Sequence, residues 1–125
     1  MNSSSQLPKR FGNAEVERNI LGAIFVDRSH VATAAEFLEP DHFSVGVNSR
    51  IFRTILELDR DRVEFDEILV SEKLSDDPEF AHAGGVAYLA NLSSLVHRMA
   101  PVKEYCKTVR ELAARQQMQR LYIYG

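Results

Sequence analysis

The chain has 125 residues, 45% of them hydrophobic, and its 18 acidic and 15 basic side chains give a formal net charge of −3. This length and apolar content predict one domain with an ordinary core, and the slight acidity argues against a protein with a basic, nucleic-acid-binding footprint over its whole surface. The chain has a single cysteine, Cys106, which excludes an internal disulfide and is expected to be buried as a small hydrophobe. No apolar run is long enough to span a membrane. We therefore expect a soluble, cytoplasmic protein.

Three segments are distinguishable along the chain. Residues 1–12 are polar and small, broken by Pro8 and Gly12, and are expected to form a flexible arm. Residues 13–98 carry several amphipathic helical patterns and are expected to form a helical head domain. Residues 99–125 follow one long helical pattern. The sequence therefore predicts an all-α protein, a compact orthogonal bundle of five to six helices followed by one long helix; only the stretch EFDEILV offers a strand as an alternative.

The first predicted helix covers about residues 14–27. Asn13 is a suitable N-cap, and Glu15 and Glu17 place negative charge in the first turn, where it interacts favourably with the helix dipole. The apolar residues at helical spacing are Val16, Ile20, Leu21, Ala23, Ile24 and Phe25.

The next two predicted helices are separated by a proline. Val31, Ala34, Ala35 and Leu38 share a face of a short helix that Pro40 must end, because proline lacks an N–H donor and restricts the residue before it. A tight turn is then expected to tuck Phe43 inward. Asn48 is placed as the N-cap of a third helix. The predicted buried stripe of that helix consists of Ile51, Phe52, Ile55, Leu56 and Leu58.

A fourth helix is predicted near residues 66–74, with Asp66 as its N-cap. The stretch SDDP stops this helix and begins a loop that runs to Gly85. A fifth helix follows, and its expected buried face consists of Val86, Leu89, Ala90, Ser93 and Val96.

The glycine pair Gly84-Gly85 precedes that fifth helix and raises the question of a phosphate-binding loop. A Walker-type loop needs a lysine directly after the second glycine, but Val86 follows here, and a dinucleotide loop needs a preceding strand. The pair is therefore predicted to supply positive φ angles at a corner of the chain.

Pro101 is placed at the start of the last helix, as its first helical residue. The apolar positions of this helix form a stripe that widens towards the C-terminus, and a long helix of this kind is expected to need a partner. We therefore expect the chain to be the front end of something longer, or the helix to pair with another copy. The helix also has an excess of basic residues, which suits either a solvated face or contact with nucleic acid or an acidic partner.

No catalytic or metal-binding constellation is recognisable. The histidines His30, His42, His82 and His97 have no metal-ligand spacing and are expected to be solvated or to cap helix ends. Ten acidic residues against three basic ones between Glu57 and Glu79 are expected to form a solvated face.

Several stretches, in order, resemble the N-terminal domain of DnaB-type replicative helicases. The opening helix of that family resembles AEVERNILGAIFVD, and its later segments resemble FLEPDHF, SRIFRTILEL, GGVAYLANL and PVKEYCKTVRELAARQQMQRL, so the resemblance covers about residues 13–123. The chain departs from the family pattern at residues 44–48 and 63–66, which suggests a divergent member.

The resemblance implies a non-catalytic scaffold: a helical head followed by a two-helix hairpin, of which this chain would contain the head and the first hairpin helix. Such domains pair as dimers and form a collar in the hexamer that binds primase, and a helicase loader is a further possible partner. ATP and magnesium would be bound only by a C-terminal ATPase domain of the parent, an ATP-dependent 5′–3′ DNA helicase, so this chain needs no cofactor and contacts DNA only indirectly.

The last helix would carry the contacts that the resemblance implies. Its apolar residues would pack on the head or on a sister hairpin, and its polar residues would face another subunit or primase. The predicted interface consists of Val102, Tyr105, Val109, Arg110, Leu112, Arg115, Gln116, Arg120 and Leu121, and the predicted structural turns contain Pro40, Gly84, Gly85 and Pro101. Two alternatives are the helicase-interacting domain of a primase and a small regulatory DNA-binding protein whose last helix reads phosphates.

Overall fold

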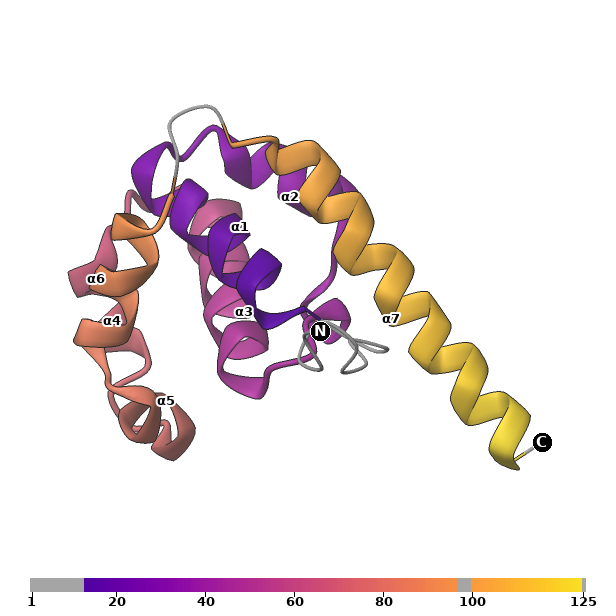
Figure 1. Cartoon of the computed structure of the whole chain (residues 1–125). Helices are drawn as coiled ribbons and strands as arrows, with labels where there is room; N and C mark the ends of the chain where they lie inside the picture. The colour runs from indigo at the N-terminus through magenta and orange to yellow at the C-terminus, as the bar shows by residue number, and fades with distance from the viewer. Residues whose placement is uncertain (1–12, 97–99, 125) are drawn as a thin grey trace, which may run out of the picture.

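The computed structural model describes residues 13–96 and 100–124, with side chains up to residue 119. Every regular element in these residues is helical, which confirms the predicted all-α class (Figure 1). The elements are α1 (Ala14–Val26), α2 (His30–Phe37), the 3-10 helix η2 (Pro40–His42), α3 (Gly46–Arg60), α4 (Glu67–Lys73), α5 (Pro78–Ala83), α6 (Val86–Ser94) and α7 (Val102–Tyr124). The predicted arm and the predicted boundary between head and last helix lie outside the described residues.

Helix α1 lies at the centre of the fold. It packs on α6 and on α7, while α2 also packs on α7 and α3 contacts α1, α2, α4 and α5. Helices α4, α5 and α6 gather on one flank, and α7 runs along the opposite flank and extends past the other helices (Figure 1). The largest fully buried apolar side chains are Ile20, Leu21, Ile24, Ile51, Phe52, Ile55, Leu89, Leu92, Val70 and Val109. None of the helices in the described residues is both long and apolar enough to cross a membrane.

Two predicted helix starts are confirmed by their capping hydrogen bonds. The Asn13 side chain accepts a hydrogen bond from the Val16 N–H at 3.2 Å, and Asp66 accepts one from the Leu69 N–H at 2.9 Å. Each side chain satisfies a backbone donor that the first helical turn leaves without a partner. The predicted inward turn is also confirmed, because Phe43 is buried directly after η2.

Gly22 allows α1 and α6 to approach closely. A Cβ atom at this position would lie 2.1 Å from the Leu92 carbonyl oxygen and 2.5 Å from Val96 Cγ2. No side chain fits in that space, so the spacing of these two helices depends on a residue without a Cβ atom.

Two expectations about helix starts are wrong. Asn48 does not cap α3, which begins at Gly46; Asn48 lies buried in the first turn, where its amide bonds to other helices. The loop expected before Gly85 contains α5 instead. Asp77 caps α5 by accepting hydrogen bonds from two backbone N–H groups, and Pro78 occupies the first turn, where its missing donor costs nothing.

The predicted face of the fifth helix is partly wrong. Helix α6 buries Leu89 and Leu92, whereas Val86 is 48% exposed and Ala90 is exposed. The reason is the contact with α1, which turns α6 so that the side of Leu92 faces the core.

The predicted turn residues lie at corners of the chain. Gly84 and Gly85 have positive φ angles of 124° and 61°, as predicted. Helix α2 ends before Pro40, also as predicted, and Pro40 itself opens η2. Pro101 lies one residue before the first residue of α7 rather than in it, and its carbonyl accepts the Tyr105 N–H at 3.0 Å.

Candidate functional site

A buried carboxylate fixes the junction between η2 and α3. Glu17 of α1 is fully buried, and both of its oxygens accept hydrogen bonds. The Ser44 N–H and hydroxyl donate to Oε2 at 2.7 and 2.6 Å, while the Val45 N–H and the Asn48 amide donate to Oε1 at 3.3 and 3.1 Å. A carboxylate in this setting needs several donors to offset its loss of hydration, and the junction supplies them.

Tyr88 extends this network from α6. Its hydroxyl donates to the Asn48 side-chain oxygen at 2.6 Å, so the network joins α1, α3 and α6. Burial raises the pKa of Tyr88 above its ordinary value of 10.0, while the nearby Arg18 acts in the opposite direction. From the sequence, Glu17 is expected only to place negative charge in the first turn of the helix. The sequence does contain a sign that Glu17 is buried, because Glu17 lies three, four and seven residues before the core residues Ile20, Leu21 and Ile24 and so shares their face of the helix.

The first half of α7 is held by the chain itself. Val102, Cys106 and Val109 are buried, and α7 contacts α1 and α2. The sequence left open whether Val102 and Val109 pack on the head or on a sister hairpin. In the structure, both residues pack on the head. Burial raises the pKa of the Cys106 thiol to about 11, which confirms the prediction of a buried, small-hydrophobe-like cysteine.

The remaining predicted interface residues lie on the more exposed parts of α7, in both halves of the helix. Arg110 and Arg115 are exposed, and Leu112 and Gln116 are half-buried. Tyr105 is partly buried and packs against the core. Met118 is 70% exposed and was not among the predicted interface residues. The side chains of Arg120 and Leu121 lie outside the described part of the chain.

A polar hollow of about 590 Å³ lies between η2, the start of α3 and the second half of α7. Gln116, from the predicted interface, is one of its lining residues. His42 caps η2 by accepting the Glu39 N–H at 3.0 Å, as expected for a capping histidine. The lining residues are Glu39, Asp41, His42, Phe43, Ser44, Gly46, Ser49, Ala113, Gln116 and Gln117. Carboxylates, hydroxyls and amides of this kind can bind the polar side chains of a partner.

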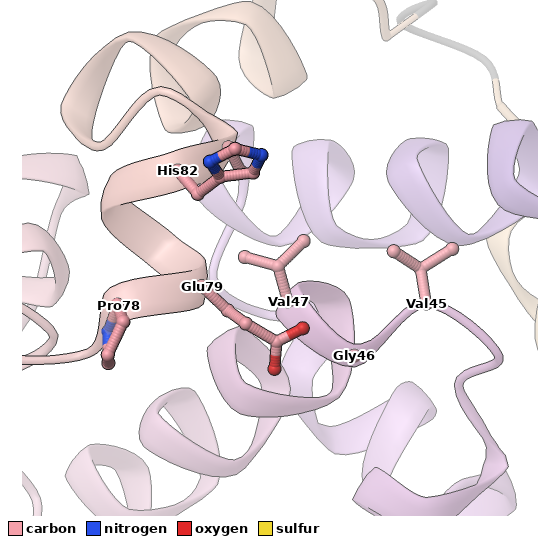
Figure 2. A pocket seen from close by; sticks show the side chains of 7 residues that line it. Val45, Gly46, Val47, Pro78, Glu79 and His82 are labelled. Atoms are coloured by element: carbon pink, nitrogen blue, oxygen red, sulfur yellow. The ribbon is translucent and has the colours of Figure 1, made fainter.

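A second hollow, of about 460 Å³, lies between the start of α3 and α5 (Figure 2). Its walls are largely apolar, with Glu79 and His82 as the polar side chains. The lining residues are Val45, Gly46, Val47, Pro78, Glu79, His82 and Ala83. Both hollows share Gly46, next to the junction that Glu17 holds, so one buried network supports both.

The candidate sites of this chain are the two hollows and the exposed residues of α7. Across the part of the chain whose placement is described, no group of three or more His, Cys, Asp or Glu residues is arranged to hold a metal ion. The positive φ angles at Gly84 and Gly85 serve a corner between α5 and α6. Arg110, Arg115 and Met118 are available on α7, and the two hollows lie beside the start of α3.

Comparisons with known proteins agree on one family. Residues 10–111 match the family described as DnaB-like helicase N terminal domain. The "Replicative DNA helicase DnaB" of Treponema pallidum (strain Nichols) is 34% identical over 106 residues, which are 85% of this chain and 24% of that protein. The protein of the same name from Geobacillus stearothermophilus is 32% identical over 109 residues, which are 86% of this chain and 23% of that protein. The chain thus spans about a quarter of the length of these relatives.

The fold has a counterpart among solved structures. The crystal structure of the N-terminal domain of DnaB helicase from Mycobacterium tuberculosis aligns with a TM-score of 0.80 and 24% sequence identity, over 94% of this chain and 89% of that chain. This likeness supports the fold, and the family match over most of the sequence supports the relationship. The chain belongs to the DnaB-like helicase N-terminal domain family.

Proposed function

We propose that this chain is a non-catalytic scaffold domain of a hexameric replicative DNA helicase. In this role it pairs with other copies to build a collar and binds primase or a helicase loader. ATP and magnesium would be bound elsewhere, in the C-terminal ATPase domain of the parent helicase, and DNA contact by this chain would be indirect. The family membership supports the helicase context, and the surface of α7 supports the scaffold role.

The change in burial along α7 is the observation that carries this proposal. Val102, Cys106 and Val109 anchor the first half of the helix in the head, while Met118 in the second half is 70% exposed. The second half also extends past the other helices (Figure 1). A helix that is anchored at one end and exposes an apolar side chain at the other is suited to helix-to-helix contact.

The polar residues of α7 from Arg110 onward would give this contact its specificity. Arg110 and Arg115 are exposed, and Gln116 lines the hollow beside η2. Guanidinium groups at an interface form directed hydrogen bonds to carboxylates, and their charge disfavours partners of the same sign. Leu112 would add apolar contact, and Arg120 and Leu121 remain predicted members of the same interface.

Sedimentation velocity of the purified chain, alone and with the primase of its host, tests the proposal. We expect concentration-dependent self-association, a complex with primase, or both, and association should weaken in the Arg110→Glu/Arg115→Glu variant. Arg60→Glu is a matched control, because Arg60 is exposed in the last turn of α3 and pairs there with Asp61. A chain that stays monomeric at high concentration and ignores primase would contradict the scaffold role.

A DNA-binding experiment distinguishes this role from that of a regulatory DNA-binding protein. Direct reading of phosphates by the basic residues of α7 predicts affinity for duplex or single-stranded DNA that falls steeply between 50 and 200 mM salt, as counterion release requires. The scaffold proposal predicts weak DNA binding and protein association that is much less sensitive to salt. Fluorescence anisotropy of a labelled oligonucleotide over this salt range measures the difference.

A further inference from the structure

The hollow between the start of α3 and α5 is an apolar recess in a charged part of the surface. It measures about 460 Å³, and its apolar walls come from Val45, Val47, Pro78 and Ala83 (Figure 2). An aromatic side chain gains much from entering a recess of this kind, because its rigid ring buries a large apolar area.

Both walls of this hollow are held in place. Arg50 of α3 pairs with Asp77 at 2.8 Å and with Glu79, which ties α5 to α3. On the other wall, Glu17 accepts the Val45 N–H at 3.3 Å and fixes the start of α3. A hollow with fixed walls binds a side chain with little loss of conformational entropy in the receiving surface.

The charge beside the hollow is negative. Asp76, Asp77 and Glu79 lie on α5 or directly before it, and Arg50 is the guanidinium that pairs with two of them. A Cβ atom at Gly46 would lie 3.2 Å from Glu79 Oε2, which places this carboxylate at the start of α3 (Figure 2). The Glu79 side chain is still 58% exposed. An occupant with a basic group next to an apolar side chain therefore matches the site.

The predicted arm, residues 1–12, has this chemistry in its sequence. Lys9 and Arg10 are its only charged side chains, and Phe11 follows them directly. The ring supplies an apolar anchor, and the two cations can form charge-assisted hydrogen bonds with exposed carboxylates. The segment Lys9–Phe11 thus complements the hollow in both respects.

The arm also joins the head next to the hollow. The Asn13 carbonyl accepts the Glu17 N–H at 3.0 Å, so Asn13 lies one helical turn, about 5 Å along the axis, before the residue that holds Val45. Phe11 precedes Asn13 by two residues, and two extended residues span about 7 Å. The hollow of the same chain is therefore within reach of the Phe11 ring.

The polar hollow beside η2 is a second possible site for the arm. Both hollows share Gly46, and Glu39 and Asp41 would attract Lys9 and Arg10 there as well. Charge alone therefore does not choose between the two hollows. The aromatic ring does, because polar walls would lose hydration against an apolar ring without gaining a hydrogen bond.

We propose that the arm docks on the head of its own chain, with Phe11 in the hollow between the start of α3 and α5. Lys9 and Arg10 then lie beside the carboxylates of Asp76 and Glu79. The hollow is thus an intramolecular binding site for a basic and aromatic peptide segment. Its lining residues belong to α5 and to the start of α3, so this inference does not depend on the proposed contacts of α7.

Nuclear Overhauser effects in the full chain test this contact without a substitution. The Phe11 ring protons should show cross-peaks to the methyl groups of Val47 and Ala83. Ala113 lines the polar hollow and is the internal control, because its methyl group should show none. A sample that mixes labelled and unlabelled chains distinguishes contact within a chain from contact between copies. Cross-peaks of Phe11 to Ala113, cross-peaks only between copies, or none to the hollow would overturn the proposal.

Hydrogen exchange of two arm variants gives a second readout. Phe11→Ala should speed exchange of the α5 amides about tenfold, as expected when an aromatic side chain no longer packs on that helix. Lys9→Glu/Arg10→Glu should speed it about threefold, because exposed ion pairs contribute less. The amides of α4, which packs on α3 and α6, should exchange at the wild-type rate in both variants. Unchanged exchange of α5 in Phe11→Ala, or an equal change in α4, overturns the docking of the arm and leaves the scaffold proposal standing.

Discussion

The Gly22→Ala substitution tests whether one missing side chain sets the distance between α1 and α6. The added Cβ would lie 2.1 Å from the Leu92 carbonyl oxygen, whereas ordinary contacts begin near 3.4 Å. The clashing atom belongs to the backbone, so rotation of a side chain cannot relieve the contact, and the two helices must separate by about 1 Å. Overpacking of this kind costs about 3 kcal/mol or more, against a gain of about 1 kcal/mol from the higher helix propensity of alanine.

We therefore expect Gly22→Ala to lower the free energy of unfolding by about 2–3 kcal/mol and Tm by roughly 10 °C. Urea and thermal unfolding followed by circular dichroism measure both quantities. Gly46→Ala is the matched control, because the atoms nearest to its added Cβ belong to the Glu79 and Arg50 side chains, at 3.2 and 3.3 Å, and flexible side chains can move. If Gly22→Ala is as stable as the wild type, the close approach of α1 and α6 does not depend on this glycine.

Three further perturbations test other parts of the fold. Glu17→Gln should lower the free energy of unfolding by about 2–4 kcal/mol, because an amide NH₂ replaces a carboxylate oxygen that accepts hydrogen bonds from neighbouring donors. Glu15→Gln is the control, because Glu15 is exposed, and it should leave the free energy of unfolding nearly unchanged in the same urea titration. Arg50→Ala should lower the free energy of unfolding by no more than about 1 kcal/mol, since the ion pairs of Arg50 are partly exposed. Amide hydrogens of α5 should nevertheless exchange faster in this variant. Unchanged exchange would mean that these ion pairs do not hold α5. Burial raises the pKa of the Cys106 thiol from 9.0 to about 11, so the stability that the buried thiol contributes is complete below pH 9 and is lost as the pH rises to about 11. The Cys106→Ala variant should lose less stability over this pH range than the wild type. Iodoacetamide at pH 8 should modify Cys106 of the wild type only after unfolding.

Local sequence signals determined most of the helices. Asn13 and Asp66 cap helices because their short side chains reach backbone N–H groups three residues ahead, which is a property of the local chain. The glycine pair likewise needed only its own backbone freedom to form a corner. Helix α5 was missed although its Asp77-Pro78 start was present in the sequence, because the stretch SDDP was interpreted as a helix stop that begins a loop, and α4 in fact ends earlier, at Lys73.

The shape of the two hollows and the exposure of α7 depended on contacts that no local pattern contains. Glu17 is buried because Ser44, 27 residues away, donates hydrogen bonds to it, and Asn48 is buried because Tyr88, 40 residues away, binds it. Helical periodicity showed that α7 was amphipathic, but its packing on α1 and α2 decided which half is covered and left Met118 exposed. The sequence by itself determined the helices, whose hydrogen bonds join near neighbours; the tertiary structure decided their rotation and exposure, because these depend on residues that folding brings together from distant parts of the chain.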